Sequence, residues 1–295
     1  MMTEFNTLAE LMAQAAERKL PLYELVIRRE METRAVSRAA VWSEMQENWR
    51  VMQAAMERGL RSEERSLSGL TGGDARRIFS RRQQGFLGEA ALTAAARAVA
   101  VSEVNAAMGR IVACPTAGSC GIVPAALQTA AEQRGSSEDE IVAALFTAAG
   151  IGMIVEQNAC IAGAAGGCQA ECGTAAGMAA GALVQLAGGA PPTICEGVAL
   201  AMKNLLGLAC DPVAGLVEVP CVKRNGFAAV HAMVAADMAL AGVRSVIPVD
   251  EVISAMQEIG RSMPAALRET AAGGLAVTPT AQAATLRIFG KSSCS

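Results

Sequence analysis

The chain has 295 residues and a formal net charge of −3, and its residues are 52% hydrophobic but only 3% aromatic. Charged residues make up 18%, a balance that excludes a globally disordered chain. Without a basic stripe, nucleic-acid binding has no support. Strand-forming residues never cluster in alternation, which excludes an all-β sandwich or barrel. Since the apolar residues are mostly small and aliphatic, we predict an all-α, mostly helical domain with a buried Ala/Gly-rich core.

The cellular location follows from the first 20 residues and the cysteines. Residues 1–20 contain Glu4, Glu10 and Glu17 and no apolar core run, so they do not resemble a secretory signal. We therefore expect a cytoplasmic protein whose nine cysteines stay reduced, and the absence of a CxxC pair argues against a zinc knuckle. The longest charge-free run, 172–195, is broken by glycines and prolines, so we predict a buried protein centre and no membrane span.

The charge distribution suggests how the single domain is organised. Residues 1–84 carry 26 of the 53 charged side chains. We predict a charged helical layer at 1–84, a core at 85–290 that would carry any site, and a short tail at 291–295. No Pro/Ser-rich linker and no internal repeat divides the chain.

The first expected elements are two helices. Thr7 and Glu10 have the spacing of a capping box, and Pro21 is expected to close that first helix. A long helix is predicted over 22–56, with Gly59 as its C-cap. It carries an apolar stripe at helical spacing that indicates core or subunit contact, made of Val41, Met45, Trp49, Met52 and Met56.

The remaining helices follow a flexible Gly-rich loop at 69–74. An Ala-rich helix is expected at 90–108, and a second capping box, Ser137 to Glu140, precedes a helix at 141–155. Further helices are predicted at 196–208, 226–241, 251–262 and 281–289.

A loop rich in hydroxyl groups and glycines is the first candidate site. It runs from Cys114 to Gly121 and leads into an apolar helix start at Ile122. Free backbone N–H groups and the helix dipole favour an anion there, such as a carboxylate. The alternative is a Ser/Thr N-cap with no ligand. The loop is not a P-loop, because no Gly-Lys-Ser/Thr follows at the required offset.

The later cysteines form the second candidate site. Cys168 follows a bare glycine turn, and Cys210 and Cys221 bracket a loop stiffened by Pro212 and Pro220. Thiolates with close backbone approach and nearby N–H donors can hold an iron–sulfur cluster. Buried structural cysteines remain the alternative, since the chain has no compact ferredoxin-type cysteine run.

Several segments together are distinctive. They are PTAGS at 115–119, GAAGGCQAECG at 163–173, CDPVAGLVEVPCVKRN at 210–225, EVNAAMG at 103–109, GLTGGDA at 69–75 and ADMALAG at 236–242. In these segments the chain resembles the α subunit of iron–sulfur-dependent L-serine dehydratase, and the likeness covers nearly its whole length.

The resemblance implies a cofactor and a reaction. Cys168, Cys210 and Cys221 would bind a [4Fe–4S] cluster with one open iron, whereas Cys172 matches no ligand position and is expected to pack. The open iron would polarise the hydroxyl leaving group of L-serine. A base would remove the Cα proton, and the enamine formed would tautomerise and hydrolyse to pyruvate and ammonia. No pyridoxal phosphate is implied.

The same resemblance implies a substrate loop. Thr116, Gly118 and Ser119 would be the donors that hold the substrate carboxylate. Cys120 stands where family members often carry alanine, and Cys114 is similarly atypical. We expect both of these thiols to behave as small hydrophobic groups.

The general base is not identified in this chain. The one histidine, His231, lies on an apolar helix and is expected to be packed and hydrogen-bonded. The resemblance implies that a separate β subunit supplies the base and part of the pocket, and hence a hetero-oligomer. The tail thiol Cys294 would either occupy the open iron, as in some related single-chain enzymes, or be incidental.

Two other functions stay open at this point. One is a related iron–sulfur lyase acting on cysteine or another β-substituted amino acid. The other is a non-catalytic helical scaffold that binds zinc or another metal.

Overall fold

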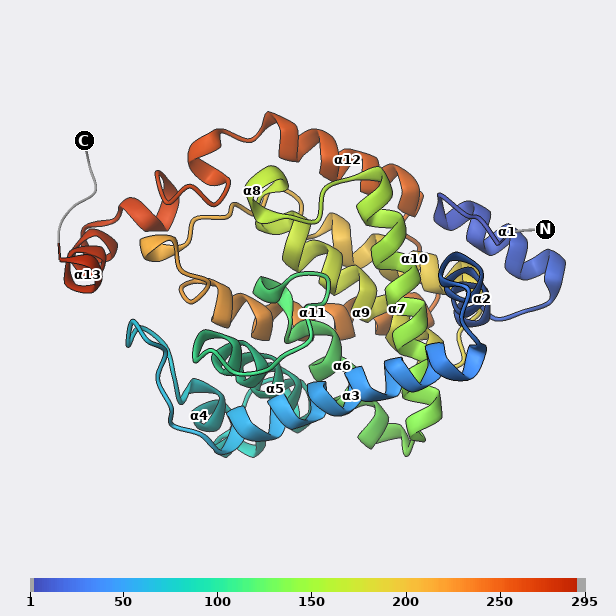
Figure 1. Cartoon of the computed structure of the whole chain (residues 1–295), viewed down its shortest axis with the longest axis horizontal. Coiled ribbons are helices and arrows are strands. Elements are labelled where there is room, and N and C mark those ends of the chain that lie inside the picture. Colours follow the sequence, from blue (N-terminus) through green and yellow to red (C-terminus); the bar gives the residue numbers. More distant parts are fainter. Residues whose placement is uncertain (1–2, 291–295) are drawn as a thin grey trace.

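The computed structural model describes residues 3–290, and every regular element in that range is helical (Figure 1). The one β-type feature described is an isolated bridge between Cys210 and Arg268. The predicted all-α class is confirmed. The α-helices are α1 Leu8–Arg18, α2 Leu22–Arg34, α3 Arg38–Arg61, α4 Asp74–Ser80, α5 Gly88–Ala106, α6 Ile122–Arg134, α7 Glu138–Asn158, α8 Gly163–Gly166, α9 Thr174–Leu186, α10 Pro191–Lys203, α11 Cys221–Leu240, α12 Val249–Ser262 and α13 Pro279–Phe289.

The two predicted capping boxes begin helices as expected. Ser137 accepts a hydrogen bond from the Glu140 amide, and the Glu140 carboxylate accepts one from the Ser137 amide, so the box at the start of α7 is complete. Thr7 caps α1 by accepting from the Glu10 amide, but the Glu10 carboxylate accepts from Asn6. Only half of the box at Thr7 is therefore formed.

The prediction of one long helix over 22–56 is wrong, because the helix is interrupted between α2 and α3. Ala35 takes a left-handed conformation with φ 53° and ends α2. Ser37 then starts α3 by accepting a hydrogen bond from the Ala40 amide. Gly59 is not a C-cap either: it lies inside α3, where a Cβ would collide with the Ala100 carbonyl of α5.

Most of the core is one connected cluster that runs from the first helix to α12. A second, small cluster lies between α4, α5 and the start of α11, and its buried members are Ala75, Val99, Ala100 and Val222. The predicted stripe on α3 belongs to the large cluster: Trp49, Met52 and Met56 are buried, and Met45 packs against that cluster. At its centre lies α9, which contacts α6, α7, α10 and α11 (Figure 1). In α9 every residue but Gln185 is buried. The charge-free run is therefore buried over 172–184, whereas residues 187–193 are partly or fully exposed. No helix within residues 3–290 combines the length and apolarity that crossing a membrane requires.

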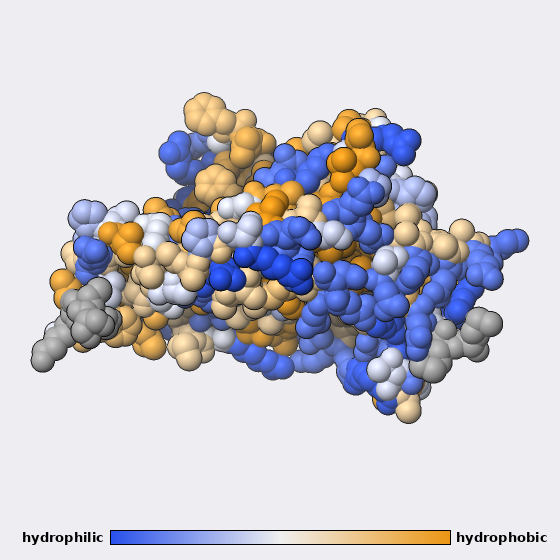
Figure 2. Space-filling view, turned by 90° about the horizontal axis from the view of Figure 1, so that it is seen from above, coloured by the Kyte–Doolittle hydropathy of each residue, from blue (hydrophilic) through white to orange (hydrophobic). Residues whose placement is uncertain are grey.

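The surface keeps the charge asymmetry of the sequence. Figure 2 shows hydrophilic side chains gathered toward the N-terminal end of one face, and more hydrophobic ones toward the opposite end. Three exposed apolar side chains lie at helical spacing on α11, namely Phe227, Val234 and Met238.

Candidate active site

The glycine-rich turn at 163–173 sets the position of the first cysteine. The short helix α8 is capped by Gly167, whose φ of +76° favours glycine and where a Cβ would lie 2.7 Å from the Met263 sulfur. Cys168 follows, and a π-helical segment, η3 (Gln169–Gly173), then leads into α9. Such π segments are frequent at functional sites.

Gln169 ties this turn to the segment that leads to Cys210. Its amide donates to the Leu208 carbonyl at 3.0 Å. Its side chain is fully buried; it accepts from the Gly207 amide at 2.9 Å and donates to the Met256 carbonyl at 2.9 Å. These bonds hold Cys168 beside the residues just before Cys210.

The three cysteines expected as cluster ligands lie in one buried region. The sulfurs of Cys168 and Cys172 are 3.4 Å apart. The Cys210 sulfur and Glu171 Oε2 each lie 2.9 Å from the position that a Cβ at Gly163 would take, so they are at most twice that distance apart. Cys221 opens α11 and is buried as well. Cys172, which was expected only to pack, therefore lies directly beside the expected ligand Cys168.

The thiols influence one another's pKa. Burial, with a further contribution from Cys168, raises the pKa of Cys221 to about 12 and also raises the pKa of Cys210. The hydrogen bond between Cys168 and Cys172, and the charge of Arg224, lower the pKa of Cys168. Cys168 is therefore the thiol that the protein itself favours as a thiolate.

Arg224 brings a positive charge to these cysteines. Its guanidinium donates to the Ala209 carbonyl at 2.8 Å and to Asp211 Oδ1 at 2.9 Å, and its charge lowers the pKa of Cys168. Asp211 is fixed in turn, because its Oδ2 accepts from the Leu275 amide at 2.8 Å. The charge of Arg224 therefore acts on the Cys168 thiol.

This donor set suits an iron–sulfur cluster better than a single ion. Within residues 3–290, no three His, Cys, Asp or Glu side chains converge as ligands of one metal ion. A cluster spreads its thiolate ligands over separate irons, so its sulfurs need not converge on a point. Buried soft thiols, a nearby cation and glycine backbone without Cβ atoms fit that requirement.

The 115–119 loop reaches the same region. Thr116 Oγ1 donates to Glu171 Oε1 at 2.7 Å, and a Cβ at Gly118 would lie 3.0 Å from the same oxygen. Ser119 is fully buried, and its hydroxyl donates to the Cys114 carbonyl at 3.2 Å. Thr116 and Gly118 therefore face the site, while the Ser119 hydroxyl is engaged within its own loop.

Asn225 fastens this loop to the helix that begins with Cys221. The side chain is fully buried. Its Oδ1 accepts from the Gly121 amide at 3.0 Å, and its Nδ2 donates to the carbonyls of Gly118 at 2.7 Å and Cys221 at 2.9 Å. One side chain thus sets the distance between the loop and the α11 cysteine.

Sequence reasoning missed Glu171 as a site residue. Its carboxyl group contacts the loop at Thr116, and burial raises its pKa. A signal was present, because Glu171 is the lone charged residue between Glu156 and Glu196. The roles of Arg224 and Asn225 were missed as well. Arg224 bonds Ala209 and Asp211, on either side of Cys210, and Asn225 bonds the distant 115–121 segment.

Three other residues that the sequence singled out have structural roles, and a fourth lies outside the described range. Cys114 and Cys120 are buried, and burial raises the pKa of each to about 12, so they behave as small hydrophobic groups as expected. His231 Nε2 lies 2.8 Å from the Ala201 carbonyl, which confirms the predicted packed and hydrogen-bonded histidine. Cys294 lies outside the described residues.

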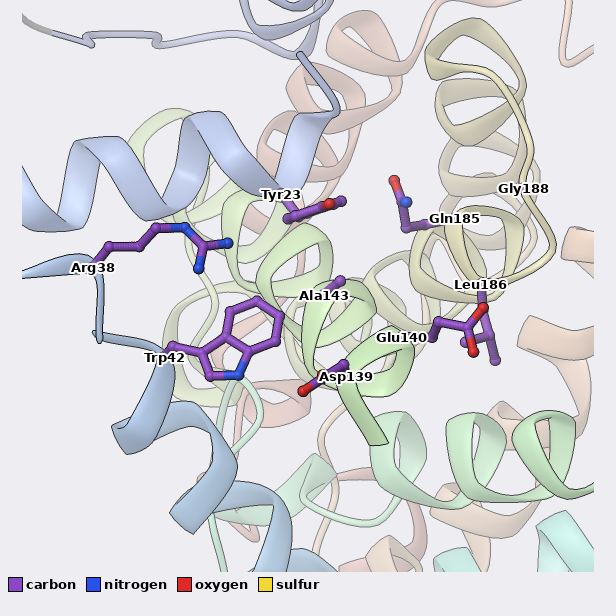
Figure 3. A pocket seen from close by; sticks show the side chains of 9 residues that line it. All are labelled: Tyr23, Arg38, Trp42, Asp139, Glu140, Ala143, Gln185, Leu186 and Gly188. Carbon is purple, nitrogen blue, oxygen red and sulfur yellow. The ribbon is translucent and has the colours of Figure 1, made fainter. Parts of the chain in front are cut away.

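A surface pocket of about 580 Å³ lies elsewhere, between α2, α3, α7 and the end of α9 (Figure 3). Tyr23, Arg38, Trp42 and Asp139 point toward it. The Arg38 guanidinium is already paired with Glu24. None of the expected site residues lines this pocket.

The comparison with known protein families identifies the chain's family. The family model described as "Serine dehydratase alpha chain" matches residues 17–276. The chain belongs to the serine dehydratase alpha chain family. The matched range includes the 115–119 loop, Glu171 and all three cysteines expected as ligands.

Individual relatives agree with this membership. The chain is 49% identical to "Probable L-serine dehydratase, alpha chain" of Bacillus subtilis (strain 168), over 97% of this chain and 96% of that protein. It is 41% identical to "L-serine dehydratase, alpha chain" of Peptoniphilus asaccharolyticus, over 94% of this chain and 96% of that protein. It is also 41% identical to "L-serine dehydratase" of Streptomyces coelicolor, but it covers only 61% of that protein.

Proposed function

We propose that this chain is the cluster-bearing α subunit of an L-serine dehydratase, which converts L-serine to pyruvate and ammonia. Family membership and the names of the relatives support the reaction. The observation that carries the proposal is that the Thr116 loop and Cys210 both adjoin the Glu171 carboxyl group. A loop suited to a carboxylate and a set of thiols suited to a cluster therefore share one buried region.

The proposed cofactor is a [4Fe–4S] cluster held by Cys168, Cys210 and Cys221. When bound, it would supply a Lewis acid for the β-hydroxyl group of the substrate. Arg224 would stabilise the negative charge of the thiolates, because its charge lowers the pKa of Cys168 and Asp211 holds it in place. Thiolate ligands persist under reducing conditions, so we place the protein in the cytoplasm.

The 115–119 loop would bind the substrate carboxylate. Thr116, Gly118 and Ser119 are the proposed loop residues. Thr116 and Gly118 face the site, whereas Ser119, whose hydroxyl group is engaged within the loop, would hold the shape of the loop. Asn225 would keep the loop in place through Gly118 and Gly121. Because the region is buried, water is largely excluded, and polar contacts to the substrate gain strength.

We propose that a separate β subunit contributes the general base and part of the pocket. Two relatives are named alpha chains, and the chain covers only 61% of the Streptomyces coelicolor L-serine dehydratase, so that protein contains additional sequence. The lone histidine is engaged with a backbone carbonyl of α10. A missing base would typically cost about 10²–10⁴ in rate.

The test is pyruvate formation from L-serine by the anaerobically prepared chain, with and without a β chain from a two-subunit relative. We expect activity only when both chains are present. Thr116→Val should lower kcat/KM, whereas Thr285→Val, a matched loss of a hydroxyl group on α13, should leave it unchanged. Full activity of the chain alone would refute the half-enzyme proposal. Pyruvate from L-cysteine but none from L-serine would assign the chain to a related lyase instead.

A further inference from the structure

Within residues 3–290 four acidic side chains are buried, and they are Glu103, Glu171, Asp211 and Glu218. Glu103 accepts from two backbone amides, Asp211 is paired with Arg224, and two serine hydroxyls donate to Glu218. Three of the four are thus provided with either a cation or two donors. Such partners are what a buried carboxylate normally requires.

Glu171 is different. Glu171 is only 9% exposed, yet in the described structure its carboxyl group accepts a single hydrogen bond, from Thr116 to Oε1. No donor reaches Oε2 and no cation pairs with the carboxyl group among these residues; another acid, Glu269, is the charged neighbour that acts on it. The carboxyl group therefore lacks a counter-ion.

Two glycines approach this group closely, because neither carries a Cβ. A Cβ at Gly118 would approach Oε1 to 3.0 Å, and a Cβ at Gly163 would approach Oε2 to 2.9 Å. The carboxyl group thus lies between the loop expected to bind the substrate carboxylate and the sulfur of Cys210.

We propose that Glu171 binds the α-ammonium group of the substrate. This inference rests on the proposed function. In an α-amino acid the carboxylate and the ammonium group share one carbon atom, so the protein groups that bind them must adjoin. Thr116 and Glu171 do adjoin, at 2.7 Å. The ammonium group would supply the missing cation and a donor for Oε2, which makes Glu171 a determinant of specificity for α-amino acids.

The test compares two inert ligands that differ only by the ammonium group, L-alanine and propanoate. Their inhibition constants against L-serine turnover, and their binding measured by calorimetry, are determined for the assembled holoenzyme and for its Glu171→Gln variant. A lost charge-assisted hydrogen bond should weaken L-alanine about 10- to 100-fold. Propanoate, which lacks the ammonium group, should change by less than about twofold.

Two further variants serve as controls. Thr116→Val should weaken both ligands, because it acts on the carboxylate that they share. Glu103→Gln alters a buried carboxyl group on α5 that accepts from two amides at the start of α4, and it should weaken neither ligand. Equal weakening of both ligands by Glu171→Gln would overturn the inference, as would unchanged binding with a fall in kcat alone. A wild-type enzyme that neither turns over L-serine nor binds L-alanine would overturn the proposed function together with the inference.

Discussion

Replacing Asn225 with alanine should destabilise the protein and separate the two halves of the site. The side chain makes three hydrogen bonds in a fully buried position, to Gly121, Gly118 and Cys221. Each buried partner left without its bond costs roughly 1–3 kcal/mol. Since some partners can readjust, we expect the free energy of unfolding to fall by about 3–5 kcal/mol. That is a large share of the total free energy of unfolding of a typical protein, about 5–15 kcal/mol.

The assay is urea unfolding followed by circular dichroism, with Asn204→Ala as the matched control. Asn204 donates to a carbonyl four residues earlier, as Asn225 does, but it is exposed at the end of α10. We expect the control to change the free energy of unfolding by no more than about 0.5 kcal/mol. A loss of less than about 1 kcal/mol for Asn225→Ala would refute the claim that this side chain fastens the loop to α11.

Two further predictions concern Gly118 and Glu103. Gly118→Ala would place a Cβ 3.0 Å from Glu171 Oε1. We expect an intact fold by circular dichroism, but a KM for L-serine raised about tenfold, as for the loss of a charge-assisted contact. An unchanged KM would contradict the contact assigned to Glu171. Burial raises the pKa of Glu103 above its ordinary value of 4.5. The folded state therefore holds this proton when the unfolded state has lost it, so wild-type stability should fall relative to Glu103→Gln as the pH rises from about 4.5 through the folded pKa. Urea unfolding across that range measures the difference, and a difference that does not vary with pH would show that burial does not govern this group.

Local signals predicted several parts of the fold. The Ser137 and Glu140 spacing correctly marked the start of α7, and the apolar stripe ending at Met56 correctly marked core. The break between α2 and α3 was missed because it depends on a left-handed Ala35, a conformation that alanine does not favour and that no sequence pattern announces.

The site was predictable only in part. The resemblance indicated the 115–119 loop and three cysteines, but the contacts that link them join residues far apart in sequence. Thr116 and Glu171 are 55 positions apart, and Gly121 and Asn225 are 104 apart. No local pattern encodes such pairs, although a lone charge in a long apolar segment, as at Glu171, is a usable hint.

Iron and sulfide content, with visible absorption, of the anaerobically purified chain tests the central claim most directly. The account predicts a brown protein with about four irons per chain. Cys210→Ser should lose them, while Cys195→Ser, a buried cysteine that contacts the Met12 sulfur instead of the site, should keep them. A colourless protein that takes up no iron on reconstitution, or a Cys210→Ser variant with a full iron load, would contradict the proposed cluster.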